Sequence, residues 1–146
     1  MQVADLMTRS VELISPADSI QDAARKMAEE DFGVLPVAEF DRLVGMLTDR
    51  DIVTRAVARG RRPEATLVRE VMSTDVKYVF EDESSDDAAR KMARLQVKRL
   101  PVLSREKRLV GILSLGDMAT TRLTRKEAGE ALSAISRPNQ NTHAHI

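Results

Sequence analysis

Two short stretches of the chain contain residue types that could bind a ligand, and they share one pattern. Residues 45–51 read GMLTDRD and residues 111–117 read GILSLGD. Each has a glycine, two apolar residues, a hydroxyl residue, two variable positions and an aspartate. Where a buried strand runs into a helix, the free amides favour an anion, and a hydroxyl can hydrogen-bond a phosphate or a sugar. An aspartate one turn later can accept hydrogen bonds from two ribose hydroxyls.

The same spacing has a purely structural interpretation, which the residues by themselves leave open. Ser/Thr-x-x-Asp is also a capping box, in which the two side chains begin a helix. Thr48 with Asp51, and Ser114 with Asp117, could serve only in this way. Their recurrence does not decide between the two, because a duplication copies helix caps as well as binding residues.

The motifs recur because the chain contains an internal repeat. Residues 3–41 align with 68–106, and residues 42–55 align with 108–121, with 21 identities in 53 positions. The run Ala-Ala-Arg-Lys-Met-Ala at 23–28 returns unchanged at 88–93. One unit of about 65 residues buries little surface by itself. We therefore expect two copies packed face to face about a pseudo-two-fold axis, with clefts between them.

Each repeat is predicted to have the element order β-α-β-β-α, which gives an α+β fold. In the first repeat, residues 11–15, 34–38 and 43–47 read as short strands. Ser19 caps a helix with a predicted buried face of Ile20, Ala23, Ala24 and Met27. Residues 48–58 read as a second helix, with inward-facing Ile52, Val53, Ala56 and Val57.

The predicted boundaries place repeat 1 at residues 3–58 and repeat 2 at 68–123, joined by a solvated linker, 59–67. A C-terminal helix is expected over 124–137, and a disordered tail over 138–146. Ala128, Leu132 and Ile135 form one stripe of that helix, which we expect to dock on the module or on a partner. His143 and His145 lie in the tail, and two ligands on a loose terminus predict no metal site.

Composition and charge exclude several classes of protein. The 146 residues hold 23 basic and 23 acidic side chains, and a net charge of zero argues against nucleic-acid binding. The absence of cysteine excludes disulfides and thiolate metal sites, and is compatible with the cytoplasm. No apolar run reaches about 18 residues and no signal peptide is apparent, so no membrane association is expected.

The zero net charge hides an uneven distribution between the two repeats. Residues 1–58 hold 6 basic and 11 acidic residues, a net charge of −5. The linker and the second repeat each carry +2, and residues 124–146 carry +1. Opposite signs favour docking of the two copies and could steer a small anion to the seam between them.

Taken together, the repeated features resemble a pair of CBS (cystathionine β-synthase type) domains, also called a Bateman module. They are the openings Asp5-Leu6-Met7 and Glu70-Val71-Met72, the Ala-Ala-x-x-Met helices, the Leu-Pro-Val strands and the Gly-x-x-Thr/Ser-x-x-Asp endings. The resemblance covers residues 3–123, and the run 45–53 looks like that of stand-alone bacterial two-CBS proteins.

This resemblance implies a regulatory protein that is not an enzyme. Such pairs commonly bind AMP, ADP, ATP, NAD or S-adenosylmethionine in clefts between the repeats. No cofactor is required beyond this regulatory adenosine ligand. The resemblance further implies a homodimer, and the length leaves room only for an effector protein that acts in trans.

The resemblance also assigns binding residues. Asp51 and Asp117 would hold ribose hydroxyls, and Thr48 and Ser114 would bond ribose or phosphate. The predicted lining of the first adenine pocket is Ile14, Ser15, Val34, Leu35 and Pro36. The predicted lining of the second is Val79, Arg99, Leu100 and Pro101.

The two predicted sites differ in composition. Arg50, beside the first motif, is replaced by Gly116 in the second. Where the first repeat has Ser15-Pro16, the second has Phe80 followed by three acidic residues, which would repel phosphate if they faced the cleft. We therefore expect the Thr48/Asp51 site to be the better nucleotide site.

Other function classes are weighed against this one. A ligand-independent interaction or oligomerisation subunit is the main alternative, with its helices mediating assembly. An enzyme would need a catalytic constellation of His, Cys, metal ligands or paired carboxylates, and none is evident outside the tail, so no catalytic residue is assigned. Nucleic-acid binding would show a steep salt dependence that a neutral chain gives little reason to expect.

Overall fold

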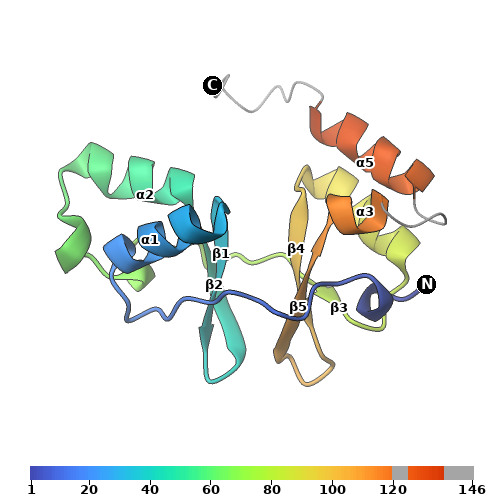
Figure 1. Ribbon diagram of the computed structural model, residues 1–146, viewed down its shortest axis with the longest axis horizontal. Coiled ribbons are helices and arrows are strands. Elements are labelled where there is room, and N and C mark those ends of the chain that lie inside the picture. The colour runs from blue at the N-terminus through green and yellow to red at the C-terminus, as the bar shows by residue number, and fades with distance from the viewer. Residues whose placement is uncertain (120–124, 137–146) are drawn as a thin grey trace. The chain divides into compact units, whose positions relative to one another are not determined.

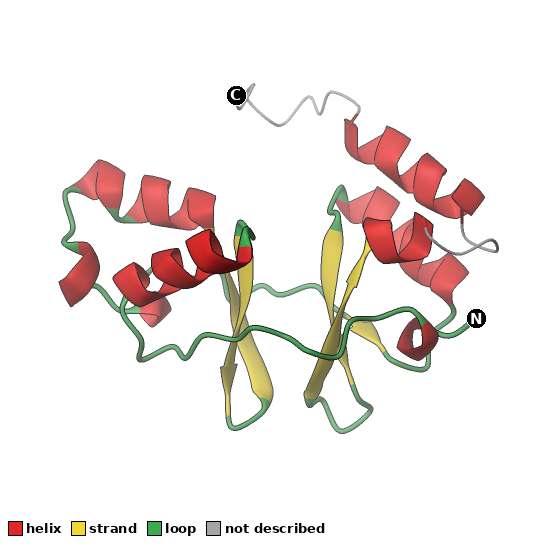
Figure 2. Cartoon of the chain, in the orientation of Figure 1, coloured by secondary structure: helices red, strands yellow, loops and turns green. Residues whose placement is uncertain are grey.

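The computed structural model describes residues 1–119 and 125–136, and the predicted tail with His143 and His145 lies outside this range. The chain divides into two compact units. The first-repeat unit comprises residues 10–77 and 105–109, and the second-repeat unit comprises residues 1–9, 78–104 and the described residues from 110 onward. Both units contain helices and strands (Figures 1 and 2), which confirms the predicted α+β class.

The first-repeat unit is a β-hairpin covered by helices. Strand β1 (Val34–Glu39) pairs antiparallel with β2 (Arg42–Thr48), and Figure 1 shows α1 (Ile20–Glu30) and α2 (Asp49–Arg55) on the same side of this hairpin. The Oγ of Ser19 accepts a hydrogen bond from the amide of Asp22 at 3.1 Å, so α1 begins at the predicted cap. Residues 11–15 do not form the predicted regular strand, since only Ile14 makes a bridge, to Val37.

The second-repeat unit is a three-stranded sheet with helices packed on it. Strand β3 (Val79–Phe80) is parallel to β4 (Arg99–Leu103), and β5 (Leu109–Ser114) is the other neighbour of β4. Helix α3 (Ser85–Leu95) precedes β4, and α4 (Leu115–Ala119) follows β5. Helix α5 (Arg125–Ser136) lies against α3 and α4 (Figure 1).

The two units have separate apolar cores that use equivalent positions of the repeat. In the first-repeat unit, Ile20, Ala23 and Met27 of α1 are buried as predicted, but Ala24 is exposed. Helix α2 ends at Arg55 rather than Ala58, and Val53 and Val57 are 56% and 59% exposed instead of facing inward. Val53 lies within α2 on a face turned away from the core, and Val57 lies beyond the end of α2 in a 3₁₀ turn, so neither joins the core that Ala56 reaches.

Helix α5 covers α3 with a face slightly different from the predicted stripe. Ala131 is buried and Ile135 packs against the core of the second-repeat unit. Leu132 is 47% exposed, so it does not dock on the module, and its docking on a partner stays a prediction. The amide Nε2 of Gln96, at the end of α3, donates to the carbonyl of Ala134 at 3.3 Å. The side chain of Ala128 lies outside the described part of the structure.

Each unit is completed by the opening segment of the other repeat. The amide of Val3 donates to the carbonyl of Glu83 at 2.9 Å, and the equivalent Val68 donates to Asp18 at 2.8 Å. Four short 3₁₀ turns occur in these segments and in the linker: Val3–Asp5, Val57–Arg59, Pro63–Ala65 and Val68–Glu70. The sequence repeat and the packed unit are therefore different pieces of the chain.

Candidate functional site

The first motif lies where β2 runs into α2, and it forms a reciprocal capping box. The Oγ1 of Thr48 accepts from the amide of Asp51 at 3.0 Å, and the amide of Thr48 donates to Oδ2 of Asp51 at 3.0 Å. Thr48 and Asp51 therefore do cap the helix, as the structural interpretation of their spacing predicts. The box leaves Oδ1 of Asp51 and the hydroxyl hydrogen of Thr48 out of its two bonds, and these atoms are what a ligand could use.

The second motif has the same geometry between β5 and α4. The Oγ of Ser114 accepts from the amide of Asp117 at 3.0 Å, and the amide of Ser114 donates to Oδ2 of Asp117 at 3.2 Å. Helix α2 has only seven residues, so its dipole offers an anion less than the predicted longer helix would. Both motifs are thus ordered by their caps and suited mainly to hydrogen bonding.

The glycine that opens each motif is required by a close approach of the chain. A Cβ on Gly45 would lie 2.7 Å from Sδ of Met72 and 2.8 Å from the carbonyl oxygen of Ser73. A Cβ on Gly111 would lie 2.7 Å from Sδ of Met7 and 2.9 Å from the carbonyl oxygen of Thr8. These glycines admit the opening segment of the other repeat beside β2 and β5, a packing role that the motif alone does not reveal.

The structure brings the predicted residues of the first site together. Val34 pairs with Thr48 across the hairpin, so the first residue of β1 lies beside the motif. The amide of Ile14 donates to the carbonyl of Pro36 at 3.1 Å, which places Ile14 along the opposite edge of β1. Ile14, Leu35 and Pro36 are buried, and Ser15, Val34, Thr48 and Asp51 are partly accessible.

The predicted residues of the second site are also neighbours. Val79 and Phe80 pair with Val102 and Leu103 of β4, and β4 lies beside β5, which ends at Ser114. Leu100 and Pro101 are buried, whereas Arg99 is partly accessible at the start of β4. In both repeats, the assignment of these residues to ligand binding stays a prediction.

Carboxylates near the second site serve the turn that follows β3. The Oε1 of Glu83 accepts from the amide of Phe80 at 3.2 Å. The equivalent Asp18 accepts from the amide of Ser15 at 2.9 Å. Glu83 therefore has a counterpart in the first repeat, and its acidity is not what distinguishes the two sites.

The residues beside the hydroxyl and the aspartate of each motif differ between the repeats, although the capping geometry is the same. The amide of Asp49 donates to the carbonyl of Gly33 at 2.9 Å, and the equivalent Leu115 donates to Lys98 at 3.0 Å. Asp49 is exposed, whereas Leu115 is 8% exposed and belongs to the core. An Asp and a Gly in one repeat thus correspond to a Leu and a Lys in the other. Arg50 is exposed on α2, and its amide donates to Oδ1 of Asp49.

Arg55 is a residue that sequence reasoning missed. Its Nε lies 3.9 Å from Oδ1 of Asp51, and its Nη1 donates to the carbonyls of Val71 at 3.0 Å and Met72 at 3.2 Å. The side chain therefore links the first motif to the opening segment of repeat 2. The i, i+4 spacing of Asp51 and Arg55 is a signal that could have found the pair.

The carboxyl groups with clearly lowered pKa values lie away from both motifs. The pKa of Glu70 is below its usual value because the Leu67 amide donates to its carboxylate and Arg61 pairs with it. The pKa of Asp87 is lowered mainly by its hydrogen bond with Arg90.

Two other features are absent from the described residues. No three His, Asp or Glu side chains gather there as metal ligands would, and no helix has the length and apolar character to cross a bilayer.

Comparison with known proteins links this geometry to a family. The family model of the CBS domain matches residues 3–58 and residues 68–123. The CBS domain-containing protein YhcV of Bacillus subtilis is 44% identical over 141 residues, which are 97% of this chain and 98% of that protein.

Two solved structures are informative neighbours. The crystal structure of Hypoxic Response Protein I with two coordinated zinc ions has a TM-score of 0.73 and 37% identity, over 82% of this chain and 97% of that one. The CBS domain pair of protein MJ0100, in complex with 5′-methylthioadenosine and S-adenosyl-L-methionine, has a TM-score of 0.70 and 27% identity. That match covers 89% of this chain and 98% of the other.

Proposed function

The chain belongs to the CBS-domain family as a tandem pair, a regulatory module, and on this premise we propose that its regulatory ligand is an adenosine-containing compound. The candidates are AMP, ADP, ATP, NAD and S-adenosylmethionine. The proposal assigns the ligand to the residues around Thr48/Asp51 and Ser114/Asp117, and gives the Thr48/Asp51 site the higher affinity.

One observation carries the proposal: a hydroxyl and a carboxylate are held in the same geometry at the same point of both repeats. The four capping distances lie between 3.0 and 3.2 Å. In the first repeat this pair adjoins Val34, and β1 in turn adjoins Ile14, so residues predicted to line a purine are neighbours of the acceptors predicted for a ribose. The binding of two adenosine compounds by the MJ0100 pair supports the same ligand class.

The chemistry of Asp51 suits a ribose better than a phosphate. Its side chain is only 13% exposed, and Oδ2 is occupied by the Thr48 amide, which fixes the direction of Oδ1. A fixed carboxylate oxygen accepts strong hydrogen bonds from hydroxyl groups. Arg55, whose Nε is 3.9 Å from Oδ1, supplies a cation beside the same oxygen. A phosphate would need countercharge, which Arg50 on the exposed side of α2 can provide.

Replacement of Asp51 by Asn tests the assignment while keeping the cap. The Asn side-chain oxygen can still accept from the Thr48 amide, but its NH₂ group cannot accept from a ribose hydroxyl. Asp117→Asn is the matched variant in the other repeat. Titration calorimetry with the five candidate compounds should show at least a tenfold loss of affinity for Asp51→Asn, a difference of about 1.4 kcal/mol. A smaller loss is expected for Asp117→Asn, and the reverse order would contradict the ranking.

A thermal-shift panel separates this function from ligand-independent assembly. A ligand present at 100 times its dissociation constant adds about 2.7 kcal/mol to the free energy of unfolding. For a chain of this size, that raises Tm by roughly 5–10 °C. If none of the five compounds shifts Tm, the proposal fails and an interaction or oligomerisation subunit becomes the better explanation.

We also propose that the regulatory output acts in trans, through a homodimer and an effector protein in the cytoplasm. A ligand can change such an assembly only by its different affinities for two arrangements. Light scattering of the wild-type protein with and without ligand would reveal the dimer and any change in it. A monomer under both conditions would contradict the dimeric part of the proposal.

A further inference from the structure

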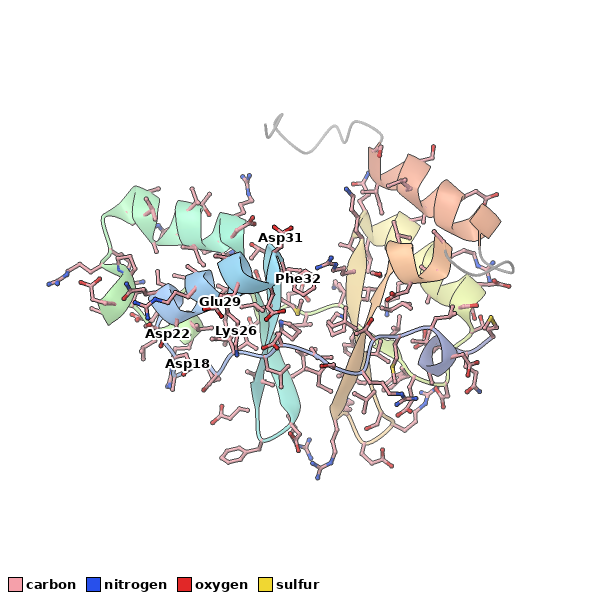
Figure 3. All side chains as sticks on the ribbon, viewed as in Figure 1. Asp18, Asp22, Lys26, Glu29, Asp31 and Phe32 are labelled. Atoms are coloured by element: carbon pink, nitrogen blue, oxygen red, sulfur yellow. The ribbon has the colours of Figure 1, made fainter. Side chains whose placement is uncertain are left out.

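The identical runs 23–28 and 88–93 each contain a lysine that makes the same contact. The Nζ of Lys26, a residue of α1 that is labelled in Figure 3, donates to the carbonyl oxygen of Leu13 at 2.6 Å. The Nζ of Lys91, on α3, donates to the carbonyl oxygen of Tyr78. Both bonds join a helix to the main chain 13 residues earlier. Both are partly buried, where a charge-assisted hydrogen bond is strong.

Each lysine has a second partner, and the two partners differ. Lys26 Nζ lies 3.7 Å from Oε2 of Glu12, an ion pair on the segment that it tethers. Lys91 Nζ lies 5.6 Å from the centre of the Tyr78 ring, a cation–π contact with the residue whose carbonyl it binds. Different side chains thus support the same bond to the main chain. The repeated feature is the lysine-to-carbonyl bond itself.

The tethered carbonyls belong to the residues directly before Ile14 and Val79. These segments have few main-chain hydrogen bonds to their sheets. Ile14 is attached to β1 by two main-chain bonds, its amide to Pro36 at 3.1 Å and its carbonyl from the Ala38 amide at 3.0 Å. Strand β3 has only two residues. A strand of this length has few ladder bonds, so one additional bond from the helix has a large share in fixing its position.

We infer that Lys26 and Lys91 are positioning residues, which fix the main chain that carries Ile14 and Val79 at the two candidate adenine pockets. The inference rests on the proposed function. The inference goes beyond the proposed function in one respect: the lysine connects its helix to the wall of the pocket. The ammonium group does so without contacting the ligand. Loss of the bond then loosens the pocket wall and leaves the capping box at Asp51 or Asp117 intact.

The test uses Lys26→Met, which keeps most of the apolar stem but has no donor. Arg25→Met is the matched control, because Arg25 is exposed on the same helix and pairs only loosely with Asp22, at 3.7 Å. Lys26→Arg restores a cationic donor. Each change is made in the Asp117→Asn background, so that binding reports on the first site. Two readouts are measured, hydrogen exchange of the Ile14 and Ala38 amides and the dissociation constant for the adenosine compound selected by the panel.

For Lys26→Met, we expect exchange of the two amides to become at least tenfold faster, with the amides of α1 unchanged. The affinity should fall about three- to tenfold, and Lys26→Arg should recover most of it. Arg25→Met should match the background protein in both readouts. Unchanged exchange would overturn the inference. Faster exchange with unchanged affinity would also overturn it, because the lysine would then be merely structural.

Two further measurements keep the inference separate from the proposed function. If the wild-type protein binds none of the compounds, the proposed function fails, and the exchange rates of Ile14 and Ala38 still decide whether Lys26 holds the segment. If Lys26→Met does not fold, Lys91→Met offers the same test in the second-repeat unit, with Arg94→Met, at an exposed position of the same helix, as its control. Exchange of the Glu81 amide, which donates to the Leu103 carbonyl at 2.9 Å, is then the readout.

Discussion

Helices α1 and α3 contain the same six-residue run, yet their surroundings differ. Ala89 of α3 is 1% exposed, and α5 lies against this helix. The equivalent Ala24 of α1 is exposed, because the described part of the first-repeat unit has no counterpart of α5. Identical sequence therefore gives identical helices but not identical burial. Within the described residues, the face of α1 that holds Ala24 is exposed where the equivalent face of α3 is covered.

The largest expected effect comes from the same substitution at these two positions. Ala89→Glu would bury an unpaired carboxylate beneath α5 and should lower the free energy of unfolding by about 3 kcal/mol or more. Ala24→Glu adds a charge to an exposed helix face and should change it by less than about 0.5 kcal/mol. Urea unfolding of both variants measures the difference. If both variants lost the same free energy of unfolding, the difference in burial between Ala24 and Ala89 would be contradicted, because α1 would have to be covered in solution.

A second pair of substitutions tests what the two units have in common. Gly45→Ala and Gly111→Ala each force a methyl group against a methionine sulfur and a main-chain oxygen. Each should cost about 1–3 kcal/mol by overpacking. Adding Met72→Ala to Gly45→Ala should not restore full stability, because the carbonyl of Ser73 remains 2.8 Å away. A loss confined to one unit would show that the opening segments are not equivalent.

The caps should contribute equally in the two units. Thr48→Ala and Ser114→Ala each remove the acceptor for an aspartate amide, and each should destabilise by about 1 kcal/mol. Chemical denaturation of the ligand-free protein gives both values. If Thr48→Ala cost several times more than Ser114→Ala, Arg55, which is present only beside the first motif, would be coupled to the cap.

The smallest effect concerns the turns that begin the two opening segments. Glu70 and the equivalent Asp5 each accept from a main-chain amide, but Glu70 also pairs with Arg61. Because the folded-state pKa of Glu70 is lowered, its stabilisation is present above the usual value of 4.5 and is lost as the pH falls through the lower value. The stability gap between wild type and Glu70→Gln should therefore close in acid. A gap that persists at low pH would contradict this assignment.

Local patterns predicted most elements of the fold. Ser19 caps α1, β1 extends one residue past the predicted end, and β2 is one residue longer than predicted at each end. The errors arose where packing overrides pattern. Val53 and Val57 have helical spacing but are exposed, and residues 11–15 read as a strand but make a single bridge.

The sequence predicted which residue types form the candidate site, but it predicted only some of the contacts that these residues make. The spacing of Thr48 and Asp51 predicted the capping box, and the repeat predicted its copy at Ser114 and Asp117. The contacts of Gly45 with Met72 and of Lys26 with Leu13 join residues 27 and 13 positions apart. No local periodicity encodes such pairs, because they depend on how the segments cross in three dimensions.

The exchanged opening segments have a consequence for how the chain responds to cleavage. The linker holds the exposed Gly60, and a cut there would leave fragments 1–60 and 61–146. Each fragment would still contribute a segment to the other's unit, through Val3 to Glu83 and through Val68 to Asp18. Covalent continuity is therefore not what keeps the halves together. The two fragments should therefore reassemble from separate chains by exchanging their opening segments.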